Sequence, residues 1–476
     1  MTLGCKLNQL ESESVTDVFI KAGYSQFPAF DSRLPPSVII INTCTVTSKA
    51  DQKARRVIRK ALRDYPEACV IVTGCYAQLN KDDILRLEAD DKKRLHVVNK
   101  KDILNLPDYL DQIINSNEQF PTPDTRYPTP DSPLPTPYSQ FQFNPQSFSA
   151  HTRSFLKIQD GCDKHCTYCK IRLARGKSVS LEADEVLSRL RILEETHAEA
   201  VLTGVNISQY SEQGTINREQ LAENNGRKFI TYLAGLLEFL LNGTEKIAIR
   251  LSSLAPESVD EKLCAVLSHP RIRPHFHLSI QSCSEKILAK MGRDYNAQTI
   301  ERAVSLLRGS KEDPFLACDI ITGFPGETGT DFKQTFSLCE KLDFAWIHVF
   351  PYSKREGTPA FSFTDNVHES DVTKRVERLT ELAEQGKARY VERWIGREVE
   401  IIIENKEQLI VNREQRKDSK EKRESRRCGV SENYLKALVR CNGDEAPAPG
   451  DAVICKLTEK CDDRDFDVIG VRQNRR

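Results

Sequence analysis

The chain has 476 residues, enough for two or three domains, and its 69 lysines and arginines equal its 69 aspartates and glutamates. This balance excludes a polyanion-binding charge spread over the whole molecule, so a nucleic-acid surface must come from local clustering. The 15 cysteines, the absence of a leader-like start and the absence of a run of roughly 18–20 apolar residues predict a cytoplasmic protein with reduced thiols and no membrane segment.

Residues 1–114 alternate short apolar runs with polar helical stretches, a pattern typical of an open α/β domain. Residues 38–41 and 69–72 are predicted to be buried parallel strands. Cys44 and Cys75 each follow one of these strands, and Cys5 lies near the chain start. Because strand-end loops of a parallel sheet meet at one edge, we expect the three thiols to lie together. The alternative is that each is a small buried apolar side chain.

A strongly basic helix is predicted directly after Cys44, opposed only by Asp51 and Asp64. One interpretation is a solvated helix face. The preferred interpretation is a phosphate-binding face for RNA next to Cys5, Cys44 and Cys75. Its candidate RNA-binding residues are Lys53, Arg56, Arg59 and Lys60.

Residues 115–150 are rich in proline, serine, threonine and glutamine. Proline at this density prevents helices and central strands. We expect an extended, poorly ordered linker between two domains.

The next region, residues 151–393, opens with the run GCDKHCTYC at residues 161–169. A four-iron cubane is held by four thiolates, but Cys162, Cys166 and Cys169 supply only three, which leaves one iron open for chemistry. Zinc with a distant fourth ligand, or three unrelated thiols, is the alternative. Zinc sites favour C-x2-C pairs at both ends, so the cluster is preferred.

Strands and helices alternate after this cysteine loop, which predicts a partial (β/α) barrel with its site at the carboxyl ends of the strands. The predicted strands are residues 154–158, 200–203, 247–251, 275–280, 315–321 and 347–350.

Residues 394–476 are predicted to form a small antiparallel β-barrel, interrupted by a charged insertion at residues 411–427. The predicted strands are residues 398–403, 435–439, 452–457 and 466–471. The insertion is either a solvated loop or a phosphate-contacting one.

These motifs together resemble the methylthiotransferase family of radical S-adenosylmethionine enzymes. The resemblance rests on both cysteine sets and on the words TLGCKLNQ at 2–9, INTCTVT at 41–47, HLSIQS at 277–282 and GVSENY at 429–434. It implies a radical SAM barrel, a TRAM-like RNA-binding domain, S-adenosylmethionine and two [4Fe-4S] clusters. The implied catalytic and metal-ligating residues are Cys162, Cys166 and Cys169 for the radical, and Cys5, Cys44 and Cys75 for the sulfur-donating cluster.

Cofactor contacts follow from the same resemblance, at the carboxyl ends of the predicted strands. The matching positions are Tyr168, Thr203, Gly204, Asn206, Ser252, Gln281 and Phe350. Family members usually have a strand before the first cysteine. This chain begins four residues ahead of Cys5, so the strand is either short or lost through a late start. A missing strand would leave a sheet edge unpaired and would loosen Cys5.

Within this family, the segments around Cys5 and Cys44 are most similar to the branch that adds a methylthio group to C2 of N6-threonylcarbamoyladenosine beside the tRNA anticodon. This branch implies the tRNA anticodon stem-loop and an external electron donor as partners, and we expect a monomer. Three alternatives remain: methylthiolation of N6-isopentenyladenosine, methylthiolation of a ribosomal-protein aspartate, and a non-catalytic iron–sulfur or zinc RNA-binding protein.

Overall fold

The computed structural model describes residues 1–27, 35–88, 93–110, 140–145, 154–212, 230–404, 425–441, 446–463 and 465–473. Most of the predicted linker, 115–150, and most of the insertion, 411–427, lie outside the described residues. Within the described part of the chain, no helix is long and apolar enough to cross a membrane.

The N-terminal part is a parallel sheet of three strands, β1 (Val38–Thr43), β2 (Cys69–Gly74) and β3 (Leu95–Val97), in that order. The central strand β2 is buried along its whole length, as its apolar run predicts. The associated helices are α1 (Lys6–Lys21), α2 (Ser48–Asp64), α3 (Cys75–Leu79), α4 (Lys81–Leu85) and η1 (Ile103–Tyr109).

The edge of this sheet beside β1 is partly covered by the start of the chain. Thr2 forms a parallel bridge with Asn42, and the Leu3 N–H donates to Asn42 O (2.9 Å). The Met1 amino group donates to Ile40 O (2.7 Å). These hydrogen bonds agree with the alternative of a short first strand, because the first three residues pair with part of this edge.

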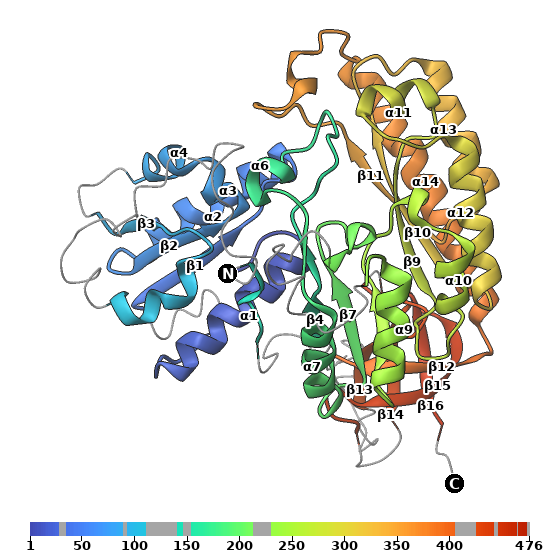
Figure 1. The fold of residues 1–476 in the computed structure, drawn as a ribbon, viewed down its shortest axis with the longest axis horizontal. Coiled ribbons are helices and arrows are strands. Elements are labelled where there is room, and N and C mark those ends of the chain that lie inside the picture. Colours follow the sequence, from blue (N-terminus) through green and yellow to red (C-terminus); the bar gives the residue numbers. More distant parts are fainter. Residues whose placement is uncertain are drawn as a thin grey trace, which may run out of the picture.

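The central part contains six parallel strands in two three-stranded sheets, β4-β7-β8 and β11-β10-β9. Parallel bridges from Ile249 to Ile272 and from Leu254 to Leu278 connect the two sheets. The predicted partial barrel is confirmed, and Figure 1 shows its helices along the outer side of the strands. The strands are β4 (Ser154–Lys157), β7 (Glu199–Thr203), β8 (Ala248–Leu251), β9 (His275–Gln281), β10 (Phe315–Thr322) and β11 (Trp346–Pro351).

The helices of the central part follow the strands in βα order, as the alternation predicts. A short antiparallel pair, β5 (Gln159–Asp160) and β6 (Val179–Ser180), brackets the cysteine loop. The helices are α6 (Ile171–Arg175), α7 (Ala183–Glu194), η3 (Ile207–Gln209), α9 (Leu233–Gly243), η5 (Pro256–Ser258), α10 (Glu261–Leu267), α11 (Glu285–Met291), α12 (Ala297–Ser310), α13 (Gly329–Lys341), η6 (Pro359–Ser362) and α14 (Glu369–Trp394).

The C-terminal part is a closed barrel of five strands in the order β12-β13-β14-β16-β15. Strands β14 and β16 pair in parallel, and the other pairs are antiparallel. Strand β13 was not predicted. It begins at residue 425, so the last three residues of the insertion predicted at 411–427 belong to the barrel. The strands are β12 (Glu398–Ile403), β13 (Ser425–Ser431), β14 (Lys436–Cys441), β15 (Ala452–Lys460) and β16 (Val468–Arg472).

The barrel packs against the amino end of β10, with Phe315 and Ala317 in the same hydrophobic core as Tyr390 and Trp394 of α14. Figure 1 places the barrel, in red, below the central strands and opposite α11. The C-terminal barrel covers the amino ends of these strands, so an active site of the central part is expected at their carboxyl ends.

The end of the predicted linker is anchored rather than extended. Phe141 and Phe143 are buried, and Lys157 Nζ donates to Gln140 O (2.7 Å). The linker prediction is therefore wrong for residues 140–145, because two aromatic side chains pack into the core.

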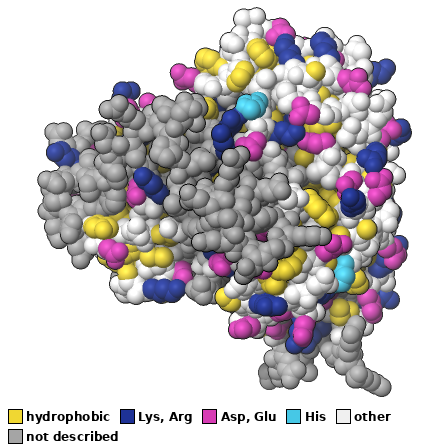
Figure 2. All heavy atoms as spheres, viewed as in Figure 1, with side chains coloured by type: hydrophobic (Ala, Val, Ile, Leu, Met, Phe, Trp, Pro, Cys, Tyr) yellow, Lys and Arg dark blue, Asp and Glu magenta, His cyan; other side chains and the backbone are white. Residues whose placement is uncertain are grey.

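Basic and acidic side chains are interspersed on the face drawn in Figure 2, over the surface that is not grey. This mixture agrees with the balanced composition. No broad field of a single sign covers the described surface on that face.

Candidate active site

The loop of Cys162, Cys166 and Cys169 starts at a residue that must be glycine. Gly161 has φ +68°, and a Cβ there would lie 1.8 Å from Lys177 O. A side chain would therefore both strain the backbone and overlap the neighbouring chain. This contact fixes where the cysteine loop leaves β5.

The carboxyl end of α11 supports the middle of the loop. The Thr167 N–H donates to Met291 O (3.0 Å), and the Thr167 hydroxyl donates to Lys290 O (3.0 Å). Gly292, with φ +73°, would place a Cβ 3.1 Å from His165 O. The missing side chain of Gly292 therefore allows the end of this helix to pack closely against the cysteine loop.

Tyr168 is held between an aromatic ring and a guanidinium group. Arg293 Nη2 donates to Tyr168 Oη (2.6 Å), and the ring of Phe324 lies edge-on at 6.3 Å between centroids. Burial raises the pKa of Tyr168, so the phenol stays protonated. These contacts anchor the loop, and a contact of Tyr168 with the cofactor stays a prediction.

The thiols of this loop are partly buried, and two of them, Cys166 and Cys169, have raised pKa values. The pKa of Cys169 is raised to about 11, chiefly by burial, with the Ile171 N–H lowering it and the nearby Cys166 and Cys162 adding to the rise. Burial also raises the pKa of Cys166. Ligation requires thiolates, so metal loading must displace the thiol protons.

Gln159, a residue that the sequence patterns did not predict, ties the cysteine loop to the turn after β7. Its Nε2 donates to Gly161 O (2.8 Å), and its Oε1 accepts from the Asn206 N–H (2.8 Å). A Cβ at Gly204 would lie 2.9 Å from Gln159 O. Three candidate cofactor residues, Thr203, Gly204 and Asn206, therefore sit on a turn bonded to the loop.

The other candidate cofactor residues lie at carboxyl ends of neighbouring strands. Ser252 follows β8, and its N–H donates to Leu202 O (3.0 Å). Gln281 ends β9 with φ +67°, a left-handed backbone that is strained for glutamine and is found most often at functional sites. Phe350 lies near the end of β11 with 40% of its surface exposed.

A polar cluster lies along β9, β10 and β11 beside these residues. His277 shares a hydrogen bond with Ser253 through Nδ1 (2.7 Å), and its Nε2 lies 3.2 Å from Asp319 Oδ1. The ring of His348 is 5.3 Å away, and Phe350 stacks on His348 at 6.5 Å. His277 has no role in the predictions made from the sequence.

The second cysteine set comes together around the carboxyl edge of the N-terminal sheet. Cys5 precedes α1, Cys44 follows β1, and Cys75 begins α3. A Cβ at Gly4 would lie 2.5 Å from the Cβ and 3.0 Å from the Sγ of Cys44, so the two loops touch. Only glycine, at φ +115°, allows this approach.

The thiols of this set act on one another electrostatically. The pKa of Cys44 is raised to about 11, chiefly by burial; the Val46 N–H and Arg175 lower it, and Cys5 and Cys75 add to the rise. The six candidate ligand cysteines are free thiols. Among the described side chains, no group of three or more His, Cys, Asp or Glu is placed around a single metal ion. A cubane is ligated at separate irons, and three free thiols at each location fit that donor set.

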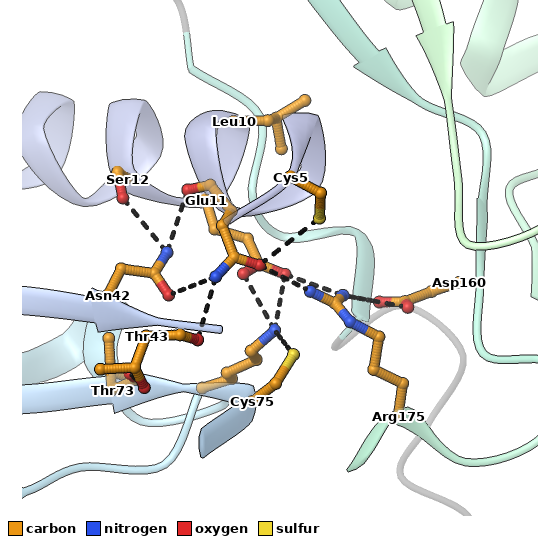
Figure 3. Close-up of polar contacts among 12 residues, drawn as sticks. Cys5, Leu10, Glu11, Ser12, Asn42, Thr43, Thr73, Cys75, Asp160 and Arg175 are labelled. Carbon is orange, nitrogen blue, oxygen red and sulfur yellow. Dashed lines mark hydrogen bonds and ion pairs between the residues drawn. The ribbon is translucent and has the colours of Figure 1, made fainter. Parts of the chain in front are cut away.

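A buried ion cluster, which the sequence patterns did not predict, lies between the two cysteine sets. Arg175 Nη1 lies 3.0 Å from Glu11 Oε1 and 3.1 Å from Asp160 Oδ1. Figure 3 shows Arg175 between these two carboxylates. Burial acts to raise the pKa of Glu11, but Arg175, Lys100 and Lys157 outweigh it and bring the pKa to about 2.

A second missed residue, Arg355, connects the loop after β11 to the loop after Cys44. Its Nη2 donates to Thr45 O (2.7 Å), and its Nη1 lies 2.8 Å from Asp51 Oδ2. Ser48 N–H donates to Ser353 Oγ (2.9 Å) beside it. Arg355 is 5% exposed, so it is part of a buried interface.

The basic helix α2 has the predicted exposure, with one difference. Lys53, Arg56 and Arg59 are exposed. Lys60 forms an i,i+4 ion pair with Asp64, so Asp64 partly neutralises its positive charge within the helix.

Comparisons with known proteins agree with this geometry. The Radical SAM superfamily model matches residues 156–339, and the model of the uncharacterized protein family UPF0004 matches residues 1–93. The threonylcarbamoyladenosine tRNA methylthiotransferase MtaB of Treponema pallidum is 41% identical over 452 residues, covering 85% of this chain and 90% of that protein. The MtaB protein of Bacillus subtilis is 32% identical over 445 residues, covering 93% and 90%.

The chain belongs to the MtaB methylthiotransferase family. As a member of the radical SAM superfamily, this MtaB-family chain uses S-adenosylmethionine and a [4Fe-4S] cluster. A solved structure of the radical S-adenosylmethionine methyltransferase TsrM from Kitasatospora setae aligns with a TM-score of 0.47 and 14% identity, over 74% of this chain and 70% of that one.

Proposed function

We propose that this MtaB-family enzyme adds a methylthio group to C2 of N6-threonylcarbamoyladenosine beside the anticodon of tRNA. The observation that carries the proposal is the 41% identity to an MtaB protein over 85% of the chain. C2 of adenine bears an unactivated C–H, so its substitution calls for radical chemistry. One equivalent of S-adenosylmethionine supplies the methyl group, and another removes the hydrogen.

Cys162, Cys166 and Cys169 would hold the cluster that supplies the electron for cleavage of S-adenosylmethionine. The Thr203, Gly204 and Asn206 turn, with Ser252, is proposed to hold the methionyl end of the cofactor, because Gln159 fixes this turn against the cysteine loop. Gln281 and Phe350, with Tyr168, complete the proposed cofactor contacts.

Cys5, Cys44 and Cys75 are proposed to hold a second [4Fe-4S] cluster that donates the sulfur. The close contact of Gly4 with Cys44 supports this assignment, because it brings the Cys5 and Cys44 loops together. Arg355 supports it as well, because it binds Thr45 and thereby places the Cys44 loop against the loop after β11. Contacts such as that of Arg355 with Thr45 would hold the two cysteine sets at a fixed distance from each other.

The anticodon stem-loop is proposed to contact the exposed face of α2, because this helix begins at Ser48, close to Cys44 in the chain. Lys53, Arg56 and Arg59 would contact phosphates, with a smaller share for Lys60. The terminal barrel is proposed to be a TRAM-like RNA-binding domain.

We further propose a cytoplasmic monomer that takes electrons from an external donor. Its domains would be residues 1–114, with the second cluster, 151–393, with the radical SAM core, and 394–476, with the RNA-binding barrel.

The deciding experiment is mass spectrometry of nucleosides from total tRNA, in a strain without this gene and in one with the gene restored. Loss and return of 2-methylthio-N6-threonylcarbamoyladenosine is the expected result. A change only in 2-methylthio-N6-isopentenyladenosine would overturn the substrate. An unchanged nucleoside profile would overturn tRNA as the target and direct attention to ribosomal-protein aspartate or a non-catalytic role.

A further inference from the structure

The ion cluster between the two cysteine sets is built from residues far apart in sequence. Glu11 lies on α1, Lys100 follows β3, and Arg175 ends α6. Asp160 directly precedes the glycine at the start of the radical cysteine loop, and Lys157 ends β4. The cluster therefore includes residues from both the N-terminal and the central parts of the molecule.

Arg175 is the centre of this cluster. Besides Glu11 and Asp160, it reaches Asn8 Oδ1 through Nη2 (3.3 Å). Its side chain is 3% exposed, as is that of Glu11. A guanidinium group buried to this degree is stable only when its donors and its charge are matched by partners.

Lys100 connects the cluster to a cysteine. Its Nζ lies 2.9 Å from Glu11 Oε2 and donates to Cys75 Sγ at 3.5 Å. Lys100 thus brings a positive charge and a hydrogen-bond donor to a sulfur of the second cysteine set.

The formal charges of the five ionic side chains do not cancel. Two carboxylates, Glu11 and Asp160, face three cations, Lys100, Lys157 and Arg175, which leaves an excess of one positive charge. An unbalanced buried charge is costly. An oxidised cubane core has two positive charges, and three thiolates bring three negative ones, so such a centre has one negative charge in total.

We propose that Lys100 and Arg175 are positioning residues for the second iron–sulfur cluster, with Lys100 hydrogen-bonding the Cys75 thiolate and the ion cluster supplying its counter-charge. This inference rests on the second cluster proposed above. Positive charge and hydrogen bonds at cluster sulfurs favour the reduced state, so they raise the reduction potential. The bonds of Arg175 to Asp160 also hold this counter-charge next to the start of the radical cysteine loop.

The test uses the full-length Cys162→Ala, Cys166→Ala, Cys169→Ala protein, which keeps only the second cysteine set. In this background we compare Lys100→Met with Lys101→Met, a matched control because Lys101 is the exposed neighbour. Iron and acid-labile sulfide are counted, and a redox titration is followed by electron paramagnetic resonance. We expect Lys100→Met to lower the reduced-to-oxidised ratio at a fixed potential about tenfold, or about 59 mV for one electron, and Lys101→Met to leave it unchanged.

Glu11→Gln separates an electrostatic effect from a folding defect. This variant removes a negative charge from the same cluster, so the ratio should change in the opposite direction, toward the reduced state. A potential for Lys100→Met equal to that of Lys101→Met overturns the inference and leaves the second cluster intact. A parent triple variant without iron and sulfide overturns the second cluster itself, and the inference with it.

Discussion

At the scale of single residues, glycines and buried polar side chains hold the cysteine loops in place. Gly161 and Gly292 permit the approach of the radical cysteine loop to its neighbours, and Gly4 permits the contact between the Cys5 and Cys44 loops. All six candidate ligand cysteines could be named from the sequence, because their spacing or their position after a strand is local. Gln159 could not, because its role depends on partners up to 47 residues away.

The Gly161→Ala substitution should prevent assembly of the radical site. A Cβ at this position overlaps Lys177 O at 1.8 Å and must also adopt φ +68°. The matched control is Gly176→Ala, since Gly176 has φ +76° but no neighbouring atom within 4 Å of the point where a Cβ would lie. The control should cost about 1 to 3 kcal/mol of stability through backbone strain alone, whereas Gly161→Ala should cost more than that and lose the iron of this loop. Equal melting temperatures and iron contents for the two variants would contradict the overlap.

Buried thiols give the metal-free protein a specific alkaline instability. Burial raises the pKa of Cys264 and of Cys169 to about 11, from an ordinary value of 9.0. Above pH 9 the unfolded chain releases protons that the folded chain keeps, so the free energy of unfolding falls until about pH 11. Cys264→Ala, which lies outside the site, should reduce this fall by about 1 to 2 kcal/mol. Urea titrations between pH 8 and 11 measure it, and an unchanged pH slope would contradict the raised pKa.

At the scale of elements, the strand and helix patterns predicted most of the fold. The six central strands were predicted because each is a short apolar run before a polar loop. Strand β13 was missed because its sequence, SRRCGVS, continues a charged run and lacks apolar alternation. Pairing on both sides, with β12 and β14, makes it a strand despite that composition.

The exposed face of helix α2 should account for part of the affinity for tRNA. Replacing Lys53, Arg56 and Arg59 by glutamine removes three charges that lie at the surface. The slope of log affinity against log salt should fall by about 2 to 3, since each phosphate contact contributes about 0.7 to 0.9. A control triple variant, Arg302→Gln, Lys333→Gln and Lys341→Gln, takes the same charge from the surface of α12 and α13. Equal slopes for both variants would reject α2 as the RNA-binding face.

At the scale of the whole molecule, two buried contacts join the N-terminal part to the central barrel. One is the ion cluster around Arg175, and the other is Arg355 with Thr45 and Asp51. Both contacts lie next to cysteine loops, so the relative placement of the two cysteine sets depends on them. Figure 1 shows α1 beside β4 and α3 beside α6, in agreement with these contacts.

Breaking the Arg355 contact should loosen the Cys44 loop. Arg355→Met leaves Asp51 without its buried partner, which costs about 3 kcal/mol or more. Hydrogen–deuterium exchange of residues 43–48 should speed up, and iron bound by the second cysteine set should fall. Lys354→Met, at the exposed neighbouring position, should change neither. Unchanged exchange in Arg355→Met would contradict its role in joining the two parts.

The sequence by itself determined the two cysteine sets, the order of the α/β sheet, partial barrel and terminal barrel, and the family. The cysteine sets and the order of the three parts rest on spacing and periodicity within short segments, and the family rests on the resemblance of the motifs. Only the tertiary structure decided which charged residues lie between the cysteine sets. Glu11 and Arg175 are 164 positions apart, and Arg355 and Thr45 are 310 apart. A buried ion pair is stable only where folding removes water from both partners and sets their geometry, and no pattern within one segment carries that information.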